Sequence, residues 1–179
     1  MSLAPSHAEI VREFTKHIID FVEQPHAMLA NLPVCPFARK ARLENRIQFE
    51  VMNLTHEGIL ALVPSFVAKS ELELMMCIHP RKDNLSSTEV DRLAERLNQT
   101  LPAMNLIALG GHPEDRFNID GLYTRRDPYP NIQIIRADVG ERAHQSIKES
   151  GYYERWTESN LLNVSASPGV MKSNERRQA

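Results

Sequence analysis

Residues 72–113 read LELMMCIHPRKDNLSSTEVDRLAERLNQTLPAMNLIALGGHP, and this stretch decides the fold. Two apolar runs, Leu72–Ile78 and Leu106–Leu109, have the length and composition of buried strands. Between them, Ser86 and Glu89 form the capping box that begins an amphipathic helix. A strand, a helix and a strand in this order predict a parallel crossover, which is right-handed in nearly all cases.

The residues before this stretch add further elements. Ser6 and Glu9 form another capping box, and the apolar residues that follow recur at helical spacing, which predicts a helix over residues 8–22. Alternating apolar and polar residues over 46–54 predict a half-buried strand. The apolar run 59–67 contains a proline, and we interpret it as a strand that leads into a loop.

Beyond residue 113, the isoleucines of 132–135 predict a further strand, and a third helix is expected over 140–150. Residues 157–179 have little periodicity and few large apolar side chains, so we expect a mobile C-terminal tail. The predicted fold is therefore a single α+β domain over residues 1–156. It has a mixed β-sheet with a parallel crossover and three main helices packed on it.

The charge balance argues against two classes of partner. The 179 residues carry 21 basic and 23 acidic side chains, interspersed along the chain, so no strong field would collect nucleic acid or an anionic membrane. No apolar run reaches the roughly 20 residues that span a bilayer, and the N-terminus lacks the pattern of an export signal. We expect a cytoplasmic protein in which both cysteines, Cys35 and Cys77, are free thiols.

The segment 110–136, GGHPEDRFNIDGLYTRRDPYPNIQIIR, concentrates charged, aromatic and conformationally special residues between two predicted strands. Ordered polar loops on a rigid scaffold are frequent binding sites. The guanidinium groups of the segment could grip a carboxylate or phosphate, and its tyrosines could donate a hydroxyl. These candidate binding residues are Arg125, Arg126, Arg136, Tyr123 and Tyr129.

An alternative is that these arginines only shape the loop. They would then pair with the four carboxylates that the same segment contains. Those carboxylates are Glu114, Asp115, Asp120 and Asp127.

Two predicted strands are followed by a His-Pro dipeptide, which places His79 and His112 at the same edge of a sheet if the crossover is parallel. Ligands of open α/β sheets collect at that edge. The two rings could act as general bases or bind a metal, with Cys77 or Cys35 as further donors. The alternative is that each ring bonds a nearby carbonyl. Because no compact metal-ligand motif accompanies them, we predict no bound metal.

Cys35 is the second candidate for a reactive group. It precedes Pro36, and a helix beginning there would direct unpaired N–H groups at the sulfur and stabilise a thiolate. The alternative is a buried cysteine that fills space beside Phe37, since free cysteines are among the most buried residues.

Three motifs together resemble domain-of-unknown-function family 1415, a family of bacterial proteins of similar length. They are CPFA at residues 35–38, the His-Pro at 112–113, and YTRRDPYPNIQIIR at 123–136. The chain departs from the family's run by carrying Arg125 in place of Asn and Asp127 in place of Ser. The family has no assigned activity, so the resemblance implies positions rather than a reaction. These positions are Cys35, Pro36, His112, Arg126, Pro128, Pro130 and Arg136.

The sequence leads to one working hypothesis. The segment around Cys35 and the loop of residues 110–130 form one pocket for a small anionic metabolite, with Cys35 or His112 as the reactive group and no cofactor. The alternative is a non-catalytic accessory protein that holds a protein partner through the same loop, because tyrosine and arginine dominate interface hot spots.

Overall fold

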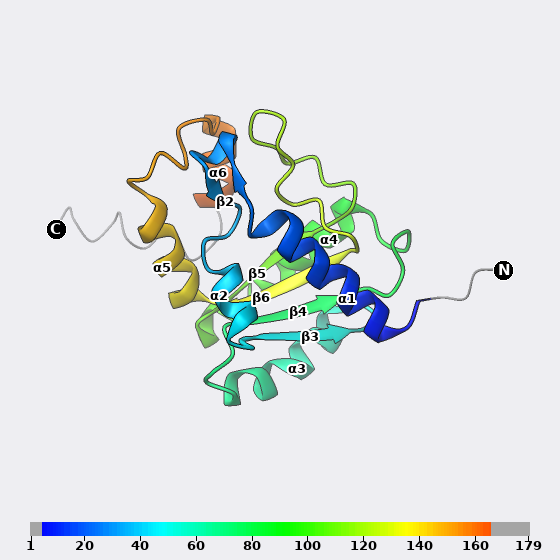
Figure 1. Cartoon of the computed structure of the whole chain (residues 1–179). Coiled ribbons are helices and arrows are strands. Elements are labelled where there is room, and N and C mark those ends of the chain that lie inside the picture. The colour runs from blue at the N-terminus through cyan, green and yellow to red at the C-terminus, as the bar shows by residue number, and fades with distance from the viewer. Residues whose placement is uncertain (1–4, 166–179) are drawn as a thin grey trace.

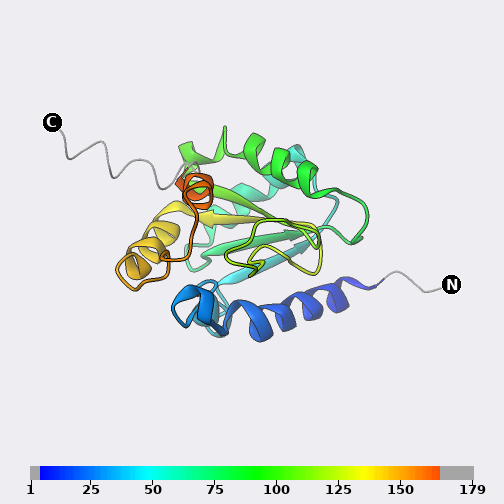
Figure 2. The same ribbon diagram turned by 90° about the horizontal axis from the view of Figure 1, so that it is seen from above.

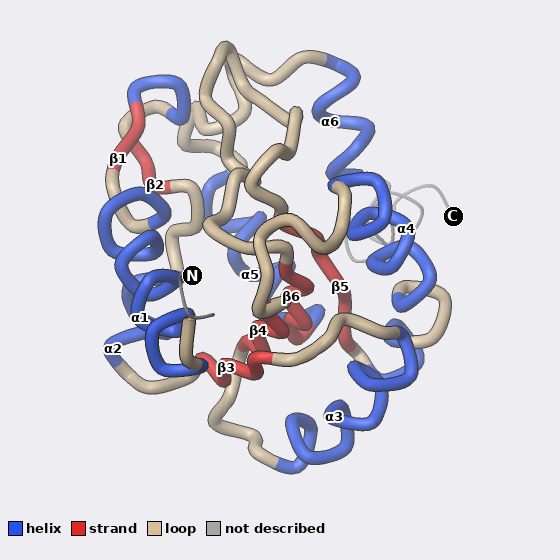
Figure 3. The backbone as a smooth tube through the Cα atoms, turned by 90° about the vertical axis from the view of Figure 1, so that its right-hand side faces the viewer, coloured by secondary structure: helices blue, strands red, loops and turns tan. Residues whose placement is uncertain are grey.

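A four-stranded sheet forms the centre of the computed structural model, which describes residues 5–165. The strands lie side by side in the order β3-β4-β6-β5 (Figures 1 and 3). Their bounds are β3, Ile47–Val51; β4, Leu74–Ile78; β5, Leu106–Gly111; and β6, Asn131–Arg136. All four strands were predicted from the sequence. The chain is a single α+β domain with a mixed sheet, as expected.

The predicted crossover is present, but it passes over one strand. β4 and β5 both run antiparallel to β6, which lies between them, so they are parallel to each other. β3 and β4 are direct parallel neighbours. The sheet therefore has a carboxyl edge, where β3, β4 and β5 end and β6 begins, and an opposite amino edge.

Helices cover both faces of the sheet. Figure 2 shows α1 on one face and α4 on the other, with α5 at the amino edge. The α-helices are α1, His7–His17; α2, Ala38–Leu43; α3, His56–Ala68; α4, Ser87–Leu97; α5, Ala137–Ile147; and α6, Glu158–Ser165. A π-helical turn, Ile18–Val22, extends α1, and short 3₁₀ turns cover Ala27–Leu29 and Leu101–Met104.

The two capping boxes that the sequence predicts are both formed. The Ser6 and Ser86 hydroxyls each accept a bond from the backbone N–H three residues on, and the glutamate at that position bonds back. Each box satisfies donors that a helix start leaves unpaired. As a result, α1 and α4 begin within one residue of their predicted starts.

The expected strand over residues 59–67 is wrong, because the segment is the middle of α3. Thr55 caps this helix by accepting a bond from the Gly58 N–H at 3.1 Å. Ile59, Val63 and Phe66 are buried at helical spacing. Pro64 lies within the helix but on its exposed side, where the lost backbone bond is accessible to water.

Each face of the sheet has its own apolar core. Met75 and Cys77 of β4 face α3 and α4, and Met76 and Ile78 face α1. This alternation follows from the two-residue period of a strand. β4 is thus buried on both sides, which explains why its sequence is apolar without interruption.

A third, smaller core lies beyond the sheet. A hairpin of β1, Pro25–His26, and β2, Leu32–Pro33, contributes Leu29 and meets residues of the β5–β6 connection and of the C-terminal segment. The buried members of this third cluster are Leu29, Ile119, Ile147 and Tyr152.

The segment predicted as a mobile tail begins with a helix. Residues 158–165 form α6, and the Asn160 side chain donates a 2.9 Å bond to the Asn118 carbonyl. This anchoring comes from a residue distant in sequence, so local periodicity did not reveal it. Residues 166–179 of the predicted tail lie outside the described residues.

Candidate functional site

The loop between β5 and β6, residues 112–130, is anchored firmly at its base. The Arg125 carbonyl accepts bonds from the backbone N–H groups of His112 and Asp127, both at 3.2 Å. Gly111 has no space for a side chain, since an added Cβ would lie 2.0 Å from Asp127 Oδ2. Glycine here permits the loop to fold directly against the end of β5.

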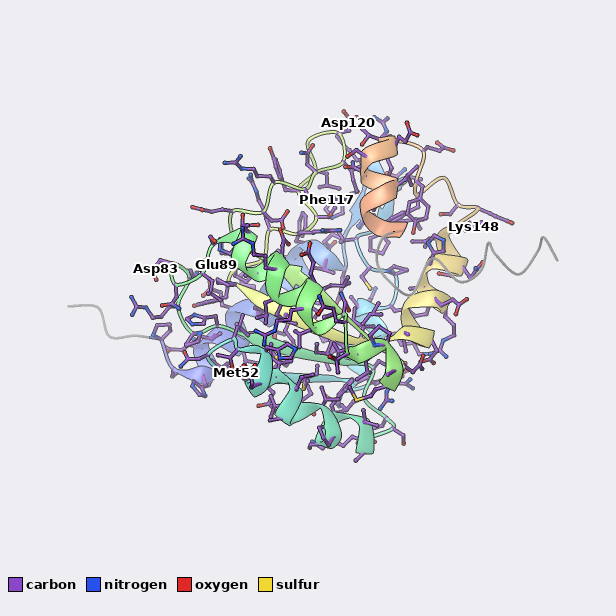
Figure 4. The ribbon with its side chains drawn as sticks, turned by 180° about the vertical axis from the view of Figure 1, so that it is seen from behind. Met52, Asp83, Glu89, Phe117, Asp120 and Lys148 are labelled. Carbon is purple, nitrogen blue, oxygen red and sulfur yellow. The ribbon has the colours of Figure 1, made fainter. Side chains whose placement is uncertain are left out.

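The tip of the same loop is a tight hairpin turn. Asp120 and Gly121 both have positive φ, 51° and 85°, and Ile119 pairs with Leu122. This is the pattern of a type I′ turn, for which Asp-Gly is a favoured sequence. Asp120-Gly121 is thus a local sequence signal for this turn. Figure 4 shows Phe117 and Asp120 in this loop beside α6, and Arg155 pairs with Asp120 at 2.9 Å.

The loop carboxylates do not pair with Arg125 or Arg126. Asp127 is buried, accepts a 2.8 Å bond from the Asn131 amide and lies 3.2 Å from His17 Nε2. Asp115 accepts a bond from the Phe117 N–H at 2.7 Å. The predicted arginine–carboxylate network is therefore wrong in its partners, because backbone and amide groups already engage these oxygens.

His112 is placed at the carboxyl edge as predicted, but its ring is fully engaged. It is only 3% exposed. Nδ1 accepts a 3.0 Å bond from the Glu114 N–H, and Nε2 lies 2.7 Å from the Leu85 carbonyl, to which it donates. Neither nitrogen is free to take a proton from a substrate unless one of these bonds breaks.

His79 also lies at this edge, so the predicted placement of both rings is confirmed. Its Nδ1 lies 3.1 Å from the Arg81 N–H, and its Nε2 lies 3.2 Å from the Asn84 amide. Each histidine thus closes a local turn, as the alternative interpretation expects. Within the part of the chain that the structure describes, no group of three or more His, Cys, Asp or Glu side chains is placed to hold a metal ion.

Cys35 lies between β2 and α2, where burial dominates its chemistry. Desolvation raises the pKa of the Cys35 thiol, and the bonds from the Phe37 and Ala38 N–H groups offset this only in part. The carboxylate of Glu73 acts in the same direction as burial. The N–H groups that the sequence predicts are present, but they do not outweigh the loss of water.

One cavity shared by Cys35 and the loop stays a prediction, and packed side chains of the third cluster occupy this region. The third cluster fills the space: Tyr152 donates a 2.7 Å bond to the Val34 carbonyl, and Phe117 stacks edge-on against Trp156. Two open hollows on the surface, of about 590 and 320 Å³, are lined by residues of α1 and β3 and by residues of α2 and its flanks. Neither is lined by the loop.

Arg136 does not join the other arginines. It ends β6 at the amino edge, where its guanidinium donates to the Leu72 carbonyl at 2.7 Å and the Lys69 carbonyl at 3.1 Å. It also lies over the Phe66 ring, at 5.2 Å. The prediction that Arg136 points into the loop region is wrong, because β6 carries it away from the loop and the end of α3 takes its donors.

Tyr129 also points elsewhere, toward α1. Its hydroxyl donates a 2.8 Å bond to Glu13, and its ring is buried against α1 and β4. Burial, together with the Glu13 carboxylate, raises the pKa of Tyr129 to about 12. This tyrosine therefore holds α1 on the sheet.

Arg126 and Tyr123 do lie together. The Arg126 guanidinium lies over the Tyr123 ring at 3.5 Å, and its Nε donates a 2.9 Å bond to the Asp115 carbonyl. The remaining donors of Arg126 are exposed to solvent.

Arg125 is the unusual cation of the loop. Its guanidinium lies 4.1 Å from the centre of the Phe117 ring. It forms no ion pair and no side-chain hydrogen bond within residues 5–165. Desolvation lowers the pKa of Arg125, and the nearby charges of Asp115 and Asp91 act in the opposite direction.

Asp91 belongs to this site although no motif in the sequence singles it out. It lies on α4, and an added Cβ at Gly110 would be 3.6 Å from its Oδ1. More than a third of the residue is exposed, but surrounding protein still raises the pKa of its carboxyl, with Asp115 adding to the effect and Arg125 opposing it. Only the packing of α4 on β5 brings Asp91 to the loop.

Comparison with known proteins found no matching family model, no matching curated protein and no matching solved structure. The resemblance to family 1415 stays a prediction. Within residues 5–165, no helix is both long and apolar enough to cross a membrane.

Proposed function

We propose that this protein binds a small molecule bearing a carboxylate or phosphate, through Arg125 and Arg126 at the base of the 112–130 loop. One observation carries the proposal: Arg125 is partly buried and desolvation lowers its pKa, yet its guanidinium donors have no protein partner within residues 5–165. Removing a charge from water is costly unless that charge is paired. A ligand anion would supply the missing partner.

The surroundings of Arg125 favour a ligand of limited size and charge. The Phe117 ring holds the guanidinium plane from one side, and the anchored carbonyl of Arg125 fixes its backbone. A planar fork held in this way can bind two oxygens of one carboxylate or phosphate. Arg126, stacked on Tyr123, adds a second cation at the solvent side of the same loop.

Binding, rather than catalysis, is the function that the geometry supports. The Cys35 thiol is held in its protonated form by burial and is separated from the loop by the third cluster. His112 uses both ring nitrogens on backbone groups. The proposal therefore assigns neither residue a chemical step.

The test is titration of the purified protein with inorganic phosphate, and separately with acetate, followed by calorimetry or NMR. Arg125→Met keeps an apolar side chain on Phe117 but removes the donors, so we expect at least a tenfold loss of phosphate affinity. Arg116→Met is the matched control, because Arg116 is an exposed arginine of the same loop. Equal affinity in both variants, or no binding of either anion, would contradict the proposal.

The accessory-protein alternative is supported by a different feature. Arg126 and Tyr123 form an outward-facing stack beside a rigid loop, and such residues are common interface anchors. If a protein partner rather than a small molecule is the ligand, Arg126→Ala should abolish its binding and leave phosphate affinity within about threefold of the wild type.

A further inference from the structure

The two outer strands of the sheet, β3 and β5, differ in whether their outward backbone groups are hydrogen-bonded. β5 is closed by a side chain: the Asn98 amide donates to the Ala108 carbonyl at 2.9 Å and accepts from the Ala108 N–H at 2.7 Å. The amide thus takes the place of a neighbouring strand. An open edge invites pairing with another chain, and natural proteins usually block it.

β3 lies at the other side of the sheet (Figure 3), and no side chain among residues 5–165 closes it in this way. The Arg46 carbonyl and the Met52 N–H both bond to β4, so every second residue between them also directs its backbone to β4. Ile47, Phe49 and Val51 consequently direct their N–H and carbonyl groups outward. No hydrogen bond reaches these outward groups from residues 5–165.

A groove runs beside this open edge. It has a volume of about 590 Å³ and lies between α1 and β3. Val11 of α1 and Phe49 and Val51 of β3 give it apolar walls, and Arg12 and Glu50 place one charge of each sign along it. A surface with both signs and an apolar centre is complementary to itself when two copies meet about a two-fold axis.

We propose that β3 pairs with β3 of a second copy of this chain, antiparallel and with the two-fold axis beside Phe49. In this register Phe49 exchanges both backbone bonds with Phe49 of the second copy, and Ile47 does so with Val51. All the outward groups of β3 are then satisfied. The Phe49 rings meet on the α1 face, where they extend the groove's apolar wall from one copy to the other.

Charge selects this register over its neighbours. With the axis at Phe49, Gln48 lies opposite Glu50 of the second copy, an amide against a carboxylate. Moving the axis to Glu50 would oppose two carboxylates, and moving it to Gln48 would leave the groups of Val51 unpaired. Within one chain, the Gln48 amide already donates to the Glu50 carboxylate at 2.7 Å.

This interface is independent of the proposed anion site. β3 and β5 lie at opposite sides of the sheet, and the loop that carries Arg125 follows β5. A dimer through β3 therefore leaves the loop of each copy accessible, and either proposal can fail alone.

The test is sedimentation equilibrium of the full chain over a wide concentration range. We expect a reversible dimer for the wild type. Gln48→Glu would place two carboxylates opposite each other in both halves of the interface, so the dimer should weaken about tenfold. The double variant Gln48→Glu with Glu50→Gln restores an amide opposite a carboxylate and should recover the wild-type affinity.

Two further observations keep the test decisive. Lys69 lies 3.4 Å from the Gln48 side-chain oxygen, so a carboxylate at this position is compatible with the fold, which thermal unfolding checks. In the wild type, the Phe49 amide should exchange more slowly with solvent as protein concentration rises. A monomer at every concentration, or a dimer that neither variant changes, would overturn the proposal. A monomer would direct the search to an extended segment of another protein.

Discussion

Arg125 lies at the carboxyl edge of the sheet and Arg136 at the amino edge, and each guanidinium lies over an aromatic ring. Arg136 directs its donors to the carbonyls of Lys69, the C-cap of α3, and of Leu72 just beyond it. Arg125 has the ring but no acceptor within residues 5–165. The guanidinium donors of an arginine thus have protein acceptors at the amino edge, whereas those of the arginine at the carboxyl edge have none in the described part of the chain.

The difference shows how a structural cation is distinguished from a candidate binding cation. At the amino edge, the guanidinium and the helix end satisfy each other, so both groups gain. At the carboxyl edge, desolvation lowers the pKa of Arg125, and Asp115 and Asp91 oppose this without forming an ion pair with it. A partly desolvated arginine without a partner lowers the stability of the ligand-free protein. We therefore infer that its partner is a bound ligand.

The largest expected effect tests whether the carboxyl edge is as rigid as the amino edge. Gly111→Ala would place a Cβ against Asp127 Oδ2 and the Asn131 amide, so the base of the loop must shift. We expect a loss of about 3 kcal/mol in the free energy of unfolding, measured in urea. Gly140→Ala is the control, since a Cβ there meets only the Ile107 side chain at 3.4 Å. Equal stability of the two variants would mean that the loop base is compliant.

A paired substitution addresses the comparison directly. Arg136→Met removes the side-chain donor to the Leu72 carbonyl and the second donor to the Lys69 carbonyl, and should cost about 2 kcal/mol in the free energy of unfolding. Arg125→Met removes a desolvated, unpaired charge and should leave stability within about 0.5 kcal/mol of the wild type, or raise it. Urea unfolding measures both. If Arg125→Met destabilises the protein as much as Arg136→Met, Arg125 is a structural residue and the proposed site loses its main support.

The smallest expected effect concerns the charge of Asp91 and its influence on anion affinity at the carboxyl edge. Burial raises the pKa of Asp91 above the ordinary value of an aspartate, so this carboxylate takes up a proton at a higher pH than a fully exposed aspartate does. An ionised Asp91 repels a bound anion. Affinity for sulfate, which stays doubly charged there, should therefore rise as pH falls through the raised pKa of Asp91.

Asp91→Asn should bind sulfate about threefold more tightly at neutral pH and lose most of this pH dependence. Calorimetry at several pH values measures both changes. The exposed Glu95→Gln on the same helix serves as the control. A pH profile unchanged by Asp91→Asn would place the bound anion away from α4.

The sequence alone predicts those elements whose residues interact with neighbours a few positions away. Ser6 and Ser86 mark helix starts through bonds to residues three positions away, and the apolar run of β4 requires only burial on both faces. The sequence predicts a strand where α3 forms, because Pro64 argues against a helix there. The buried side chains of α3 nevertheless recur at helical spacing. The resulting prediction of the sheet was correct in class and in the crossover, although it did not place β6 between β4 and β5.

The candidate site was predictable only in part. The 112–130 loop was singled out correctly as an ordered segment, because its glycines, prolines and charges are local features. The partners of the nearby charged residues were not predicted. Asp127 bonds Asn131, and Arg136 of β6 bonds the Leu72 carbonyl. Asp91 was missed entirely, because nothing near it in sequence distinguishes it from other exposed helix carboxylates.

The sequence by itself determined where helices and strands begin, which strand is buried on both faces, and which loop is ordered. These properties depend on backbone geometry and on neighbours within a few residues. Tertiary structure alone decided that Arg136 is satisfied while Arg125 is not, that an aromatic cluster separates Cys35 from the loop, and that Asn98 closes one edge of the sheet while β3 stays open. Each of these depends on contacts between residues far apart in the chain, and only the folded arrangement fixes the distances over which charge, burial and hydrogen bonding act.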